Sequence, residues 1–185
     1  MLLCDDITFS ICEFLDNKNK IQFLSVNTTM DAYKDKVFYN DIADFYNIIN
    51  LFYFDQFVNI YTDVLYTFPK HIKYLTFDSD FDEDVENDLP YGITHLCFLN
   101  YFKHSRCTSI PSSVTHLVIN KGFCYNNIHG ITYASNKIIL PSVNHLEFGC
   151  QFKQDLPSIP SSVKTITLST YYDKIIPDNL NVKWI

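Results

Sequence analysis

The sequence predicts an α+β protein, in which an N-terminal α-helical module precedes a solenoid of short parallel β-strands. Two observations support this fold class. The first 68 of the 185 residues contain neither Gly nor Pro, and their apolar residues recur three and four positions apart, which is the helical period. The remaining residues contain all four Gly and all seven Pro, and they carry one short motif several times.

The helical half divides into a module over residues 1–45 and a helical linker or N-terminal cap over 46–68. A first helix begins after Asp5 and Asp6, because carboxylates are favourable near a helix N-terminus. The apolar positions that define the first two helices are Ile7, Ile11, Phe14 and Leu15, then Ile21, Phe23 and Leu24. A longer helix is predicted from Val37 or Phe38 through Ile42, Phe45, Ile49 and Phe52, with further helical turns as far as Leu65.

A repeat fills residues 69–185. Each unit begins with Pro, continues with an apolar residue and a central Leu or Ile, and carries an aromatic ring six positions beyond that central residue. The unit spacing falls mostly in the 20–29-residue range of leucine-rich repeats. The predicted units lie near 69–89, 90–110, 111–140, 141–159 and 160–176, with a partial unit at 177–185. The recurring rings are Phe81, Phe102, Phe123, Phe152 and Tyr172.

Alternation along each strand predicts two faces. The central Leu and the apolar residue two positions later face the core, and the residues between them face outward. Stacked units therefore place one set of outward residues in rows across a parallel sheet. We expect this row of side chains to bind a protein partner: Tyr74, Thr76, His95, Cys97, His116, Val118, His145, Glu147, Thr165 and Thr167.

Composition argues against several functions. The formal net charge is −7 and Arg106 is the sole arginine, so the basic surface that binds nucleic acid is missing. Six cysteines include no Cys-x-x-Cys pair, the N-terminus does not resemble a secretory signal, and no stretch is apolar enough to cross a membrane. We expect an intracellular, cytoplasmic protein with free thiols, and no nucleic-acid or membrane partner.

We expect neither a metal nor a cofactor. The three aligned histidines have only Cys97 and Glu147 as plausible further ligands, whereas a structural zinc site usually needs four converging ligands. The acidic run from Asp78 to Asp88 lacks the Gly and the final Glu of a calcium loop, because Glu83 and Leu89 occupy those positions. A solenoid hydrolase would need a carboxylate pair from Glu147, Asp155 and Asp173, and nothing in the sequence fixes their separation. The sequence therefore does not predict an enzyme.

The repeated unit resembles the FNIP repeat, a leucine-rich-repeat relative of amoebae and the giant viruses that infect them. The segments 110–117 (Ile-Pro-Ser-Ser-Val-Thr-His-Leu) and 159–166 (Ile-Pro-Ser-Ser-Val-Lys-Thr-Ile) carry the resemblance best. It covers residues 69–185, and it implies a protein-interaction solenoid, in the host cytoplasm if the chain is viral.

Residues 1–45 resemble a degenerate F-box, with Cys4 in the place of the usual Pro and no Trp after Asn27. This resemblance implies that the module docks on a Skp-family adaptor of a cullin-type ubiquitin ligase, while the repeats select the protein to be ubiquitinated. The implied adaptor contacts are Ile7, Ile11, Leu15, Ile21 and Leu24. Alternatively, the helices only cap the open edge of the solenoid, and the chain is a structural or scaffold repeat protein without a ligase link. The target and the oligomeric state do not follow from the sequence.

Overall fold

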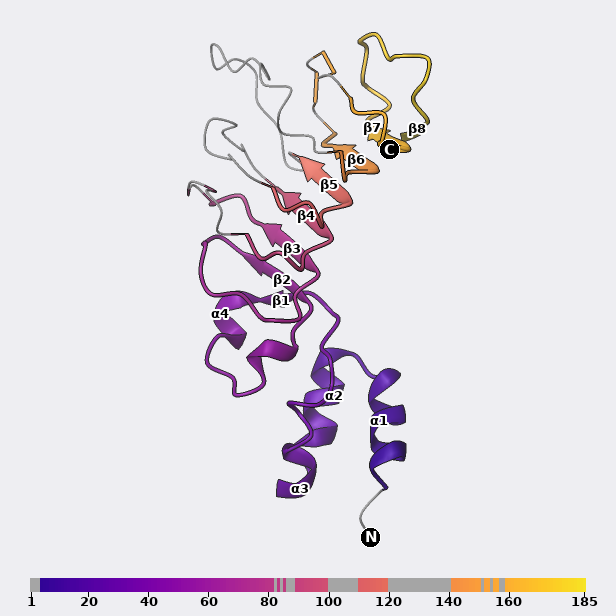
Figure 1. The fold of residues 1–185 in the computed structure, drawn as a ribbon. Coiled ribbons are helices and arrows are strands. Elements are labelled where there is room, and N and C mark those ends of the chain that lie inside the picture. Colours follow the sequence, from indigo (N-terminus) through magenta and orange to yellow (C-terminus); the bar gives the residue numbers. More distant parts are fainter. Residues whose placement is uncertain are drawn as a thin grey trace.

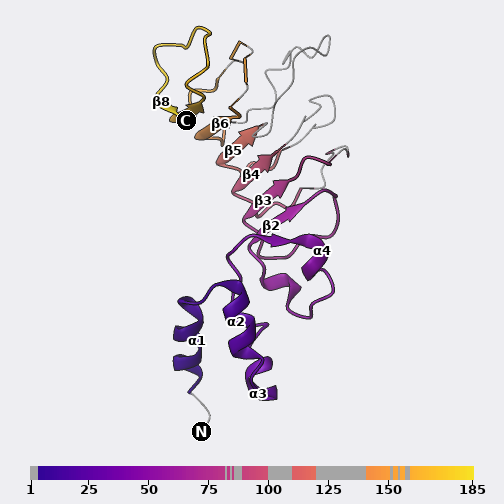
Figure 2. The same ribbon diagram turned by 180° about the vertical axis from the view of Figure 1, so that it is seen from behind.

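The computed structural model consists of an N-terminal group of helices at one end of a stack of parallel strands (Figure 1). Seen from behind, the labelled strands follow one another from β2 to β8, with helices α1, α2 and α3 at the end of the molecule far from β8 (Figure 2). The structure describes residues 4–81, 83, 85, 89–99, 110–119, 141–150, 152–153, 155–156 and 159–185.

Three short helices form the N-terminal part: α1 (Asp5–Glu13), α2 (Asn17–Leu24) and α3 (Thr28–Asp31). Helix α2 begins where the side chain of Asp16 accepts a hydrogen bond of 2.7 Å from the backbone N–H of Asn19. Helix α3 begins in the same way, since the side chain of Asn27 accepts from the N–H of Met30 at 2.9 Å. Such caps satisfy N–H groups that have no partner within the helix.

The described strands form one parallel sheet in sequence order, from β1 to β8. The register aligns the central apolar residue of each strand with that of the next, so Leu75, Leu96, Leu117, Leu146 and Ile166 form one row. In the last unit Val182 pairs with Ile166, which fixes the register that the sequence left open. The strands are β1 (Ala43–Asp44), β2 (Asn59–Thr62), β3 (Tyr74–Phe77), β4 (His95–Phe98), β5 (His116–Ile119), β6 (His145–Phe148), β7 (Thr165–Leu168) and β8 (Val182–Trp184).

A β-turn precedes most strands and explains the recurring Pro. The carbonyl of Pro111 accepts a hydrogen bond from the N–H of Val114 at 3.0 Å, and Pro69, Pro90, Pro160 and Pro177 accept equivalent bonds. Pro lacks an N–H group, and before the strand this costs no bond of the sheet. The Ser pairs of the repeats lie within these turns, as turn chemistry predicts.

The predicted long helix between residues 37 and 65 is wrong. This segment contains only two short helical turns, α4 (Phe45–Ile48) and η1 (Phe54–Gln56), and it contributes strands β1 and β2 to the sheet. Tyr39 forms a further parallel bridge with Phe57. The apolar spacing that predicted a helix arises because α4 and η1 lie in the connections between these strands. Residues 46–68 therefore belong to the parallel sheet and are not a helical cap.

The core is made by two rows of inward side chains, each with one residue from every strand of β3–β7. All ten residues are under 4% exposed, and Ile60 and Thr62 continue the two rows into β2. The first inward row is Leu75, Leu96, Leu117, Leu146 and Ile166, and the second is Phe77, Phe98, Ile119, Phe148 and Leu168. Rings of the return segments cover the second row: Phe81 stacks on Phe77 at 4.0 Å between ring centroids, and Phe152 stacks on Phe148 at 4.2 Å. Tyr172 continues this layer, while the predicted rings Phe102 and Phe123 lie outside the described residues.

Polar contacts join the helices to the first turn of the solenoid. The Nζ of Lys20 is buried and donates to the carbonyl of Phe38 at 2.6 Å, with the ring of Tyr39 beneath it at 5.6 Å. The side chain of Asn17 donates to the carbonyl of Asp41 at 2.9 Å, and the carboxylate of Asp41 accepts from the N–H of Asn17. Burial raises the pKa of the Tyr39 phenol, which therefore stays neutral. These contacts hold the helices against the repeats.

Candidate interaction surfaces

The outward face of the sheet carries the side chains that the sequence predicted there. The register places Tyr74, His95, His116, His145 and Thr165 in one row. The second row contains Thr76, Cys97, Val118, Glu147 and Thr167. Tyr74 and His145 are exposed and most of the others are half-buried, whereas Thr167, between Glu147 and Lys183 in the register, is only 9% exposed. Thr167 therefore offers the least surface to a partner.

Four rings of the first row form a continuous stack, which we call the histidine column (Tyr74, His95, His116 and His145). Ring centroids are 4.3 Å apart between Tyr74 and His95, 4.0 Å between His95 and His116, and 4.2 Å between His116 and His145. These separations are shorter than the usual strand spacing of about 4.8 Å. The rings therefore lie closer together than the strands that carry them.

Threonine hydroxyls contact two imidazoles. The Oγ1 of Thr115 lies 2.9 Å from Nδ1 of His116 and 3.3 Å from the carbonyl oxygen of Thr94. Thr94 makes the same pair of contacts, with Nδ1 of His95 and the carbonyl oxygen of Lys73. Each of these carbonyls also accepts two backbone N–H groups, from the threonine and from the histidine that follows it. Each threonine thus lies between an imidazole and the preceding strand.

The surroundings keep these imidazoles neutral. Partial burial lowers the pKa of His116, and the neighbouring His95 and His145 lower it further. Partial burial and His145 likewise lower the pKa of His95. The direction agrees with the expectation that stacked imidazoles resist simultaneous protonation. In the unit of His145, Asn144 occupies the position of the threonine, and its Oδ1 is buried without a partner among the described residues.

The column is not built to chelate one metal ion. The planes of His95 and His116 are 15° apart, so their lone pairs run side by side instead of converging. Among the described residues no group of three or more His, Cys, Asp or Glu side chains could hold a metal. Much of the acidic run from 78 to 88 lies outside the described residues.

The three carboxylates considered for hydrolysis are not brought together. Glu147 lies on the outward face of β6, whereas Asp155 and Asp173 both lie close enough to Tyr172, on the return side, to affect its pKa. Burial is the main cause that raises the pKa of this phenol. The sheet therefore separates Glu147 from the other two carboxylates, and Glu147 cannot form a glycosidase-type pair with either of them.

The outward face extends further than the sequence predicted. Tyr61 of β2 pairs with Thr76, and Asp44 of β1 pairs with Tyr61, so both continue the second row. Burial, together with Asp78, Asp80 and Asp44, raises the pKa of Tyr61, which indicates that these carboxylates gather at the N-terminal end of this face. Alternation of inward and outward residues over 59–62 was the signal in the sequence that could have revealed strand β2.

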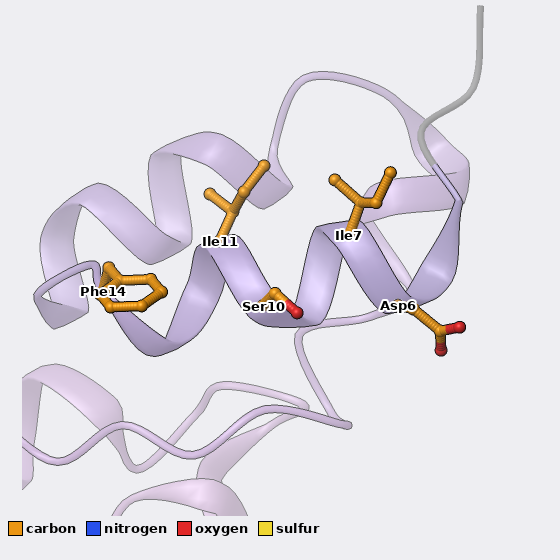
Figure 3. Close-up of a pocket in the computed structure, with 5 residues that line it drawn as sticks. All are labelled: Asp6, Ile7, Ser10, Ile11 and Phe14. Carbon is orange, nitrogen blue, oxygen red and sulfur yellow. The ribbon is translucent and has the colours of Figure 1, made fainter.

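Helix α1 leaves an apolar strip uncovered. Ile7 is 51% and Phe14 is 88% exposed, although Thr8 and Cys12 on the other side of the helix are buried. Ile7 and Ile11 project from the same side of α1, and with Asp6, Ser10 and Phe14 they line a shallow pocket (Figure 3). We call Ile7, Ile11 and Phe14 the α1 strip.

The predicted adaptor contacts separate into two groups in the structure. Ile7 and Ile11 lie on the α1 strip, whereas Leu24 is fully buried in the core. Leu15 and Ile21 are half-buried. Leu24 therefore stabilises the fold and offers no surface to a partner, while Phe14, absent from the predicted contacts, offers the most.

Comparison with known proteins identifies the repeat. Residues 136–171 match the family model described as "FNIP Repeat". The chain therefore contains an FNIP repeat. The match includes strands β6 and β7, and the neighbouring units share the same register and turn.

Similar proteins occur in Acanthamoeba polyphaga mimivirus. A "Putative F-box protein" is 35% identical over 86 residues, which are 46% of this chain and 32% of that protein. A "Putative F-box and FNIP repeat-containing protein" is 28% identical over 109 residues (59% of this chain, 36% of the relative). A "Putative FNIP repeat-containing protein" is 25% identical over 199 residues (97% and 46%). The chain thus spans about a third to a half of the length of these relatives.

Among solved structures, that of CroV588, described as a novel circular LRR protein structure, is similar to this chain. The TM-score is 0.48 at 25% sequence identity, covering 70% of this chain and 21% of the other. Within the described residues, none of the helices has the length and apolar character needed to span a membrane.

Proposed function

We propose that this protein is a substrate receptor of a cullin-type ubiquitin ligase, with two separate interaction surfaces. Residues 1–45 would dock on a Skp-family adaptor through the α1 strip, and the outward face of the repeats would bind the target protein. The chain itself would carry no catalysis. The names of two mimivirus relatives, which refer to an F-box, support the first part of this proposal.

The observation that carries the proposal is the exposed α1 strip. An isolated exposed apolar side chain is ordinary, but three on one side of a single helix leave a continuous apolar surface. The helix is held by its opposite side, since Phe9 packs on Tyr33 at 5.3 Å between ring centroids and Cys12 is buried. The α1 strip is therefore free to contact a second protein without disturbing the fold.

The outward face has the composition of an interface core. Its centre, formed by the histidine column with Thr76, Cys97 and Val118, has no Lys, Arg, Asp or Glu. Interface cores are enriched in aromatic residues and depleted of charged ones, and their rims are polar. Here the charged side chains Asp44, Glu147 and Lys183 lie towards the ends of the same face.

Co-purification with a Skp-family adaptor tests the ligase role. The double variant Ile7→Asp/Phe14→Asp should lose the adaptor and keep its circular dichroism spectrum. Ile175→Asp is the matched control, because Ile175 is 91% exposed at the other end of the chain. Capture by the wild type and the control, but not by the double variant, is the expected result. Equal capture of all three, or no capture of the folded wild type, would contradict the ligase role and favour a scaffold repeat protein.

A further inference from the structure

We propose that the histidine column is a proton-operated switch on the outward face, and that its central imidazole, His116, controls this switch. While His116 is neutral the rings stay stacked, and protonation of His116 opens the stack and leaves the face positively charged. This inference goes beyond the proposed function, because it concerns the repeats alone and needs neither an adaptor nor a target.

His116 has an imidazole on each side. Its ring centroid lies 4.0 Å from that of His95 and 4.2 Å from that of His145, and the ring planes are 15° and 12° from parallel. The ring of His116 therefore separates the two outer imidazoles. Repulsion between like charges weakens with distance, so the column accepts two protons most readily on the outer rings. A third proton, on His116, places positive charges on adjacent rings.

The causes of the lowered pKa values agree with this order. Partial burial is the main cause that lowers the pKa of both His95 and His116. His145 lowers both values further, and His95 also acts on His116. The central imidazole thus meets two charged neighbours when it takes up its proton, and we expect it to be protonated last.

Charged groups near the column favour a proton at one end. In the two outward rows of β3–β7, Glu147 is the one carboxylate, and it lies two positions after His145 on the same strand. Lys73 and Lys164 come directly before the first row, and the Nζ of Lys73 donates to the carbonyl of Gly92 at 3.3 Å. The other titratable residues on this face of the described strands are Asp44, Tyr61, Tyr74, Cys97 and Lys183.

The charge of the face and the contact between the rings change together. The two rows contain neither Lys nor Arg, so each proton taken up adds a positive charge to a centre that has none. Adjacent imidazolium rings repel each other, and the stack loses the contact that holds it closed. The strands beneath can stay in place, because their inward side chains remain buried in the core. The switch is therefore local to the outward face.

NMR of the full chain, labelled with nitrogen-15 and carbon-13 and titrated from about pH 7.5 to about pH 5, tests the proposal. The carbon-bound protons of each imidazole report its titration, and NOEs between rings report the stack. His116→Phe keeps a central ring that cannot be protonated, and His95→Phe/His145→Phe removes both neighbouring charges. His71→Phe is the matched control, because His71 is exposed in a turn outside the column.

His116 should titrate at a lower pH than the two outer imidazoles, and the NOEs between adjacent rings should disappear only as His116 titrates. In His116→Phe the NOEs should persist to the lowest pH, because the central ring stays neutral. In His95→Phe/His145→Phe the titration of His116 should move to higher pH. His71→Phe should change neither the order nor the NOEs.

Three results would overturn the proposal. The first is titration of His116 together with the outer imidazoles or before them. The second is loss of the NOEs at the same pH in the wild type and in His116→Phe. The third is unfolding before His116 titrates, followed through the backbone amide signals of the strands, because the switch acts within the folded chain. Failure of adaptor capture, which uses helix α1, would leave these results unaffected.

Discussion

His95 and His116 stack with their ring centroids 4.0 Å apart and their planes 15° from parallel. Each ring also receives the same threonine contact from the residue before it. The repetition follows from the register, because a unit step along the chain places the same side chains directly opposite in the parallel sheet. One motif in the sequence thus places equivalent side chains next to each other along the histidine column.

Stability should fall as the solution is acidified through the range in which histidine titrates. The folded-state pKa values of His95 and His116 lie below the ordinary value of 6.5, so the unfolded chain binds more protons between the two values. The stabilisation is complete above about pH 6.5 and is lost as the pH falls towards the folded pKa values. Urea unfolding at about pH 7.5 and pH 5.5 measures the loss.

The double variant His95→Phe/His116→Phe is the control for this pH dependence. Phenylalanine keeps two stacked rings and cannot be protonated, so the loss of stability between the two pH values should become smaller than in the wild type. An undiminished loss would show that other groups cause it.

Replacement of Lys20 by Met should destabilise the junction between the helices and the repeats. The ammonium of the buried Lys20 donates to the Phe38 carbonyl at 2.6 Å, and methionine leaves this oxygen without that donor. We expect a loss of about 1–3 kcal/mol in the free energy of unfolding, measured by urea denaturation. Lys18→Met is the matched control, since Lys18 is exposed in the same helix. Equal losses of stability from Lys20→Met and Lys18→Met would show that the contact between Lys20 and Phe38 does not stabilise the junction.

Leu24 and Ile7 should behave in opposite ways when each is changed to alanine. Leu24 is fully buried, so Leu24→Ala should cost about 2–5 kcal/mol in the free energy of unfolding. Ile7 is 51% exposed, and Ile7→Ala should change stability by less than about 0.5 kcal/mol while weakening capture of the adaptor. Thermal unfolding checks the first effect and co-purification checks the second. Similar losses of stability would contradict the division between core and α1 strip.

The units from residue 69 onward could be predicted from the sequence because Pro, the central Leu and the outward histidines recur at fixed offsets. Strands β1 and β2 could not be predicted in this way. Their units lack the opening Pro, and the short turns α4 and η1 in their connections place apolar residues three and four apart. Local helical spacing was genuine there, but it extended over only one turn at a time.

The outward face followed from strand alternation, so its residues could be predicted before the structure. Which apolar residues of the helices are buried and which are exposed could not be predicted. Leu24 and Ile7 both fit an apolar helical pattern, and only the packing of the helices shows that the first is enclosed and the second is open. The threonine contacts with Nδ1 also depend on side-chain geometry that spacing does not reveal.

The protonation state of the histidine column is the central claim about this surface, and nitrogen-15 NMR of the imidazoles measures it directly. The lowered pKa values of His95 and His116 predict neutral rings at about pH 7.5, assigned by comparison with His95→Phe and His116→Phe. Imidazolium signals of these two residues at this pH would contradict the account.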